Sequence, residues 1–197
     1  MSRKSQMQAR EELPPIPKPQ KALLQITIRP ETWIVAPIVT KEQLSRWHKL
    51  GWIDDEGLHL DKAFPRNSEG KPFLLKLWIR APMIRACEKL AKKGEIELEK
   101  CRELVNNMEI VDENGRELNY IVISEKPLRY RKIIGKTGKT TFYEYIDSTY
   151  EIKFLAETSD PVTLAKILAE AQTVGLMSGT KKGYGKFRVS VEARVTS

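Results

Sequence analysis

The chain has 197 residues, of which 41% are hydrophobic and 30% are charged, enough for one domain with a real core. No apolar run approaches the about 18 residues of a membrane helix, and the first ten residues lack the apolar stretch of a secretory signal. We therefore expect a cytoplasmic protein with no membrane partner. Its net charge of +8 favours a polyanionic partner.

The first part of the chain combines a proline-rich arm, a strand and an insertion. Residues 1–20 hold four prolines and few large apolar side chains, so we expect a disordered arm. Residues 23–29 alternate between apolar and polar side chains and predict a half-buried strand. The stretch from about 30 to 72 is tryptophan-rich, and we interpret it as an insertion packed on the core. Within it, Thr40 and Gln43 form a capping box that predicts a short helix.

Two helices are expected in the middle of the chain, over residues 81–93 and 96–106. Pro82 suits the first turn of the first helix, and Gly94 suits its end. Cys87 and Cys101 fall at apolar positions of these two helices, so we expect two buried, reduced thiols. Neither cysteine has a second cysteine or histidine at metal-ligand spacing, so we expect no metal site.

A strand over residues 118–124 and a β-hairpin over residues 129–146 follow, the hairpin within a second insertion at about 126–147. The hairpin tip resembles a P-loop in its glycines and lysines. The motif would need a glycine at position 133, which is isoleucine, and a helix after it, where the sequence favours a strand. No dinucleotide fingerprint occurs either, so we expect no cofactor.

The C-terminal part predicts a strand over residues 150–156, a helix capped by Asp160 with Pro161 in its first turn, and a glycine-rich loop over residues 175–185. Strict alternation then predicts a strand over 186–195. Without the insertions, the order is strand, helix, strand, strand, helix, strand. This βαββαβ order predicts an α+β protein with a ferredoxin-like core, forming a single domain over residues 21–197.

Basic charge is concentrated in two segments that contain no acidic residue, residues 129–141 of the hairpin and residues 175–188, which cover the glycine-rich loop and the start of the last strand. Glycines let backbone amides approach phosphates, lysines supply charge, and a tyrosine ring can stack on a base. The candidate RNA-binding residues are Gly175, Gly179, Lys181, Lys182, Gly183, Tyr184, Gly185, Lys186 and Arg188 in the loop and the last strand, and Arg129, Arg131 and Lys132 in the hairpin.

The helix, the loop ending in Gly183-Tyr-Gly-Lys-Phe187 and the terminal strand together resemble the RAMP proteins of CRISPR systems, which are repeat-associated RNA-binding proteins. The resemblance is close over roughly the last 40 residues. It implies a ferredoxin-like fold, a guide or crRNA-like RNA as partner, and other subunits of a ribonucleoprotein complex. It also implies one of two roles, an RNA-binding backbone subunit or a metal-independent endoribonuclease.

Three functions remain open from the sequence. The first is a non-enzymatic RNA-binding subunit of a CRISPR-type ribonucleoprotein, which we rank highest. The second is a metal-independent ribonuclease, for which His48 is a weak candidate as the catalytic acid or base. The third is a non-enzymatic interaction or structural protein, which could be viral, whose loop serves packing or protein contact.

Overall fold

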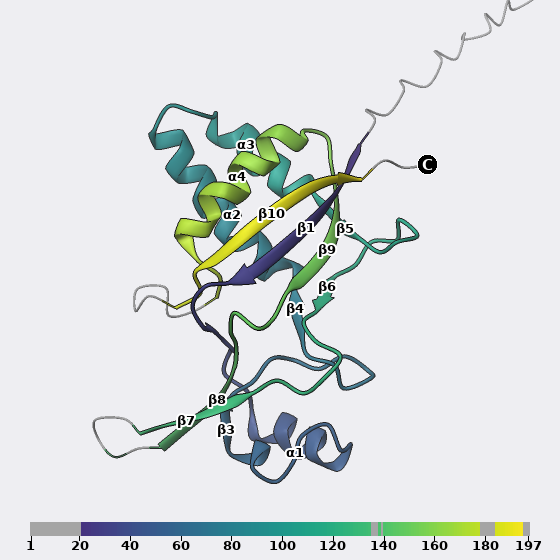
Figure 1. Cartoon of the computed structure of the whole chain (residues 1–197), viewed down its shortest axis with the longest axis vertical. Helices are drawn as coiled ribbons and strands as arrows, with labels where there is room; N and C mark the ends of the chain where they lie inside the picture. The colour runs from purple at the N-terminus through teal and green to yellow at the C-terminus, as the bar shows by residue number, and fades with distance from the viewer. Residues whose placement is uncertain (1–20, 135–137, 139, 178–183, 195–197) are drawn as a thin grey trace, which may run out of the picture.

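The computed structural model describes residues 21–134, 138, 140–177 and 184–194 (Figure 1). The predicted N-terminal arm and the centre of the glycine-rich loop lie outside the described residues. Within the described part of the chain, no helix is long and apolar enough to cross a bilayer.

The main sheet has four strands in the order β10-β1-β9-β5, and every pairing is antiparallel. Its strands are β1 (Ala22–Pro30), β5 (Glu109–Val111), β9 (Ile152–Thr158) and β10 (Phe187–Arg194). The alternation of β1 buries every second side chain, Leu24, Ile26 and Ile28. Because β1 and β9 each pair on both sides, these two strands form the centre of the sheet. The predicted α+β class is confirmed.

Three helices, α2 (Lys76–Lys92), α3 (Leu98–Asn107) and α4 (Pro161–Val174), lie on one side of this sheet (Figure 1). Along the chain, the strands of the main sheet and these helices follow the order β1-α2-α3-β5-β9-α4-β10. The Asp160 side chain accepts a hydrogen bond from the Thr163 amide, which confirms the predicted cap of α4.

Two predicted elements were wrong. The segment 118–124 does not supply the second strand of the main sheet, because β6 (Tyr120–Val122) pairs with β4 (Phe73–Leu75) in a separate two-stranded sheet. The strand β5 takes that place, and its three residues are too few to show an alternating pattern. In addition, α2 begins five residues before the predicted start, so Pro82 lies inside the helix. Burial of Ile79 and Met83 extends the apolar stripe across this proline.

The two segments interpreted as insertions form a second sheet, in the order β2-β8-β3 with β7 added to β8. We call this region, with the helix beside it, the small lobe (Figure 1). Its elements are β2 (Ile34–Val35), α1 (Lys41–Lys49), the 3-10 helix η1 (Gly57–His59), β3 (Leu60–Lys62), β7 (Tyr130–Ile134) and β8 (Thr140–Ile146). The predicted hairpin and the predicted capping box of α1 are both confirmed.

Leu44, Trp47, Leu60 and Ala63 give the small lobe a hydrophobic cluster of its own. The main core extends toward the lobe through Ile34 of β2 and Ile146 of β8. The strands β2 and β8 of the lobe are therefore packed on the main core.

Cys87 of α2 and Cys101 of α3 form a disulfide, with their Cα atoms 5.7 Å apart. The prediction of two reduced thiols is therefore wrong. The turn at Gly94, whose φ is +73°, folds α3 back beside α2 and brings together two cysteines 14 residues apart. Sequence spacing alone cannot reveal this, since it depends on how the two helices pack.

Reduction of this disulfide should destabilise the protein. A cross-link that closes a loop of this size contributes about 3 kcal/mol by restricting the unfolded chain. Urea denaturation with and without dithiothreitol measures the effect as a change in the free energy of unfolding. The Cys101→Ser variant is the control, since reductant should leave its denaturation midpoint unchanged. An equal response to reductant in both proteins would contradict the assignment.

Candidate nucleic-acid interface

The glycine-rich loop begins and ends at one backbone junction. The Leu176 amide donates to the Gly185 carbonyl at 2.8 Å, which closes the loop at its base. The Gly185 amide donates to the Trp33 carbonyl at 2.9 Å, and the Lys186 amide donates to the Thr32 side-chain oxygen at 2.9 Å. The loop base is therefore fixed to the segment that leaves β1.

Gly185 is required at this junction for two reasons. Its φ is +80°, a conformation that side chains disfavour, and a Cβ atom there would lie 2.1 Å from the Leu176 carbonyl oxygen. Gly175 also serves the fold, because it ends α4 with a φ of +84° and its carbonyl accepts from Arg85 at 3.3 Å. These two glycines position the loop.

An aromatic cluster surrounds Trp33 beside this junction. The ring of Tyr184 lies nearly parallel to that of Trp33, at an angle of 7° with centroids 6.3 Å apart. The ring of Tyr145, from β8, lies 5.2 Å from Trp33 by centroid distance, and the Arg131 guanidinium lies 4.5 Å from the Trp33 ring centroid. Arg131 comes from β7, so the hairpin and the glycine-rich loop meet on Trp33.

Tyr143 of β8 is also close to this cluster. Burial raises the pKa of its hydroxyl, the neighbouring Tyr184 adds to the rise, and the positive charge of Arg131 opposes it. Tyr143 is directly opposite Arg131 in the hairpin register. The hairpin face that carries Arg131 is therefore the face that adjoins the glycine-rich loop.

Lys132 lies on the other face of the hairpin, because successive strand residues point to opposite sides. Its ammonium lies 5.9 Å from the ring centroid of Phe142. This face borders a hollow of about 430 Å³ lined by Glu56, His59, Tyr130, Lys132 and Phe142. The structure thus separates two cations that the sequence places side by side.

The remaining described candidates are exposed to solvent. Arg188 of β10 pairs with Glu31 at 2.6 Å, and Arg129 pairs with Asp147 at 3.7 Å, while Lys186 is exposed beside the loop base. Gly179, Lys181, Lys182 and Gly183 lie outside the described residues.

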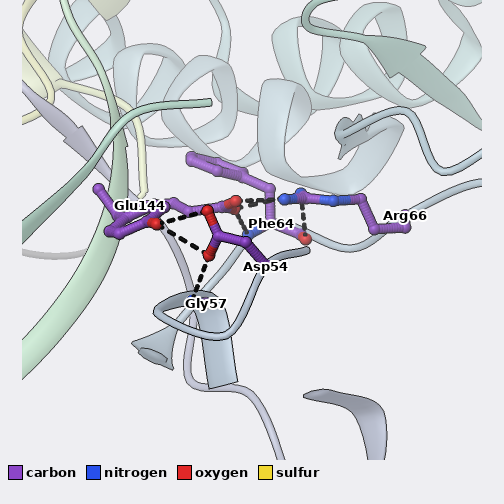
Figure 2. A network of polar contacts seen from close by, with 6 residues as sticks. Asp54, Gly57, Phe64, Arg66 and Glu144 are labelled. Carbon is purple, nitrogen blue, oxygen red and sulfur yellow. Dashed lines mark hydrogen bonds and ion pairs between the residues drawn. The ribbon is translucent and has the colours of Figure 1, made fainter. Parts of the chain in front are cut away.

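A buried ion pair anchors the hairpin to the segment that follows β3 (Figure 2). The side chains of Arg66 and Glu144 form direct hydrogen bonds and are only 1% and 2% exposed. The Glu144 carboxylate also accepts from the Phe64 amide at 2.9 Å, and Arg66 donates to the Phe64 carbonyl at 2.9 Å. Burial raises the pKa of Glu144. The charge of Arg66 opposes this rise, because it stabilises the carboxylate.

A second contact fixes the start of β7. The Tyr130 hydroxyl donates to the two Asp54 carboxylate oxygens at 2.9 and 3.0 Å, and the Gly57 amide donates to Asp54 at 2.8 Å. The amide hydrogen bond from Gly57 is the main cause that lowers the pKa of Asp54, while burial raises that of Tyr130 to about 12. Both strands of the hairpin are therefore attached to other parts of the small lobe, β8 through Arg66 and β7 through Asp54.

The weak catalytic candidate His48 lies near the end of α1, and its Nε2 is 2.7 Å from the Asp55 carboxylate. Asp55 is 93% exposed, so this contact lies at the surface. In the described part of the chain, no group of three or more His, Cys, Asp or Glu side chains could hold a metal ion.

Sequence reasoning missed Trp33 and Tyr145 as parts of the candidate site. Both are aromatic residues in the expected insertions, with no local signal that distinguishes them from core residues. Two observations could have drawn attention to them. Trp33 lies three residues after the end of the first strand, and Tyr145 shares a strand face with Tyr143.

Comparison with solved structures shows a shared fold. A chain of a type III-B Cmr-beta complex bound to cognate target RNA aligns with a TM-score of 0.54 at 13% identity, over 88% of this chain and 60% of that one. A chain of a type IV-B CRISPR complex aligns with a TM-score of 0.52 at 10% identity, over 89% and 92%. The sequence matches no protein-family model and no curated protein. The architecture is thus similar to that of CRISPR complex subunits, in agreement with the RAMP resemblance.

Replacement of Gly185 by alanine should destabilise the protein more than replacement of a glycine at which a side chain strains the positive φ but meets no neighbouring atom. Gly94→Ala is the matched control, since its φ of +73° is similar and nothing lies within 4 Å of the added Cβ. We expect a loss of about 1 kcal/mol for Gly94→Ala and a clearly larger one for Gly185→Ala, because the latter adds a backbone clash. Thermal denaturation compares the two variants. Equal losses would show that the junction can relax.

Removal of one partner of the buried ion pair should be severe. Glu144→Ala leaves the Arg66 guanidinium buried without its counter-charge, and we expect a loss of about 3–5 kcal/mol in urea denaturation. Glu125→Ala is the control, because Glu125 is 72% exposed in its pair with Lys71 and should change stability by less than about 1 kcal/mol. A small effect at Glu144 would contradict the anchoring role.

Proposed function

We propose that this chain is an RNA-binding subunit of a CRISPR-type ribonucleoprotein. It contacts the RNA backbone through the glycine-rich loop and the basic hairpin β7–β8, with a guide or crRNA-like strand and other subunits as its partners. One observation carries the proposal: both acid-free basic segments contact Trp33. The Arg131 guanidinium of the hairpin lies over the Trp33 ring, and the Gly185 amide at the base of the loop donates to the Trp33 carbonyl.

The fold supports this proposal independently. One chain of similar fold belongs to a type III-B Cmr-beta complex bound to cognate target RNA, and another belongs to a type IV-B CRISPR complex. The resemblance of the C-terminal loop to RAMP proteins rests on sequence, whereas the structural similarity covers 88% and 89% of the chain. The two kinds of similarity therefore point to the same class of assembly.

The exposed cations around the junction can bind phosphates at modest cost. Arg188 and Arg129 would exchange carboxylate partners for phosphate. Both guanidinium groups are exposed, and Arg188 and its partner Glu31 form a solvent-exposed pair that stabilises the protein by about 1 kcal/mol or less. Arg131 has a planar guanidinium held over Trp33, which orients its donors before RNA arrives. Phosphate binding releases counterions, so affinity depends steeply on salt and little on sequence.

A ribonuclease is the second candidate because the structure supplies His48 with an orienting carboxylate, Asp55 at 2.7 Å. A histidine held by a carboxylate can act as a general acid or base. Incubation of labelled RNA with the protein in a metal chelator decides between the two functions. We expect intact RNA, whereas cleavage that is lost in His48→Ala would establish the nuclease.

The Arg131→Ala and Lys132→Ala double variant should weaken RNA binding and lower its salt dependence. Each lost phosphate contact to single-stranded RNA reduces the slope of log K against log salt by about 0.7. Fluorescence anisotropy at several salt concentrations measures both quantities. The control is Lys92→Ala with Lys100→Ala, which removes equal charge from exposed positions on α2 and α3.

If both double variants lose the same affinity, only net charge matters and the hairpin is no specific site. Absence of RNA binding by the wild-type protein at low salt, together with a stable homo-oligomer, would instead favour the interaction or structural protein.

A further inference from the structure

Trp33 and Tyr184 form a pair of aromatic rings beside the base of the glycine-rich loop. Both are only partly buried, and their planes are nearly parallel, at 7°. Their centroid separation of 6.3 Å is too long for full face-to-face contact, since stacked bases are spaced by about 3.4 Å along a strand. The rings therefore share one stacking direction without covering each other completely.

The backbone holds this pair in place before any ligand binds. Gly185, the residue after Tyr184, donates its amide to the carbonyl of Trp33 itself at 2.9 Å. The Lys186 carbonyl accepts from the Glu31 and Thr32 amides at 2.8 and 3.2 Å. The two rings thus project from segments that are joined by direct hydrogen bonds. A ligand that stacks on the rings therefore does not have to order these segments, which keeps the entropy cost of binding low.

Positive charge lies next to the rings. The Arg131 guanidinium lies 4.5 Å from the Trp33 ring centroid, and Lys186 is exposed two residues after Tyr184. An aromatic surface beside cations is the arrangement that binds an unpaired base and its phosphate in single-stranded nucleic acid. A base inside a duplex has both faces covered by its neighbours and could not use it.

We infer that Trp33 and Tyr184 form a binding site for one unpaired nucleobase of RNA, with Arg131 on the phosphate beside it. This inference rests on the proposed function and extends it from backbone contact to base contact. It assigns a role to Trp33 and makes the protein selective for a strand in which at least one base is unpaired. Base identity matters little, because every base has a π-face.

The test compares two forms of one labelled single-stranded RNA of about 15 nucleotides, a length within the range for single RNA-binding folds. One form is intact, and the other carries abasic residues in its central part. For intact RNA, Trp33→Leu and Tyr184→Leu should each raise Kd by about 5- to 150-fold, the usual range for one stacked base. For abasic RNA, whose affinity for the wild-type protein is already lower, both variants should have almost no effect.

Two control variants remove rings of the same kind elsewhere. Trp78→Leu acts on the main core, and Tyr120→Leu acts on a partly exposed ring of β6, so both should leave Kd unchanged. Thermal denaturation of all variants separates stability from binding, and Tyr184→Phe should bind like the wild type because it keeps the ring.

Equal affinity of the wild-type protein for intact and abasic RNA would overturn the base site while leaving the phosphate contacts in place. Equal losses of Trp33→Leu on both RNAs would show that Trp33 only supports Arg131 and the loop. Failure of the wild-type protein to bind either RNA would refute both this inference and the proposed function.

Discussion

The close contact of Gly185 with the Leu176 carbonyl is the constraint on which the candidate site depends. It ties together three parts of the chain that are remote in sequence, the end of α4, the start of β10 and the segment leaving β1. Only a residue without a side chain fits there, since a Cβ would lie 2.1 Å from that oxygen. The antiparallel pairing of Arg29 with Arg188 and of Pro30 with Phe187 carries this alignment directly into the main sheet.

Much of the fold was predictable because local patterns agreed with their tertiary surroundings. The last strand, the hairpin and the two helix caps each have a signal within a few residues, either alternation or a capping side chain. The strand β5 has three residues and no such signal, so the sequence favours the more β-branched segment 118–124 as the second strand. The start of α2 was missed because burial of Ile79 outweighs the local effect of Pro82.

The candidate site was predictable only in its charged and loop residues. Arg131, Tyr184 and Lys186 stand out in sequence because they lie in acid-free basic segments. Trp33 is remote from all of them along the chain, and only the pairing of β1 with β10 brings it beside Tyr184. Gly185 was predicted as a phosphate-binding glycine, and its backbone contacts give it a structural role at the base of the loop. Composition thus identified the segments, while the fold determines which residues face one another.

The buried pair of Arg66 and Glu144 has a consequence beyond stability. Ion pairs of this kind are often no more stabilising than apolar residues of the same size, because both charges lose their hydration. They do penalise misalignment strongly, and β8 is a strand in which a shift of one residue would turn every side chain to the opposite face. Such a shift would move Glu144 away from Arg66. Because β7 is paired with β8 and would move with it, the shift would also turn Arg131 away from Trp33 and turn Lys132 toward that ring. The pair therefore selects the register in which the planar guanidinium, rather than the lysine ammonium, lies on the tryptophan ring, and a cation–π contact of this geometry favours arginine.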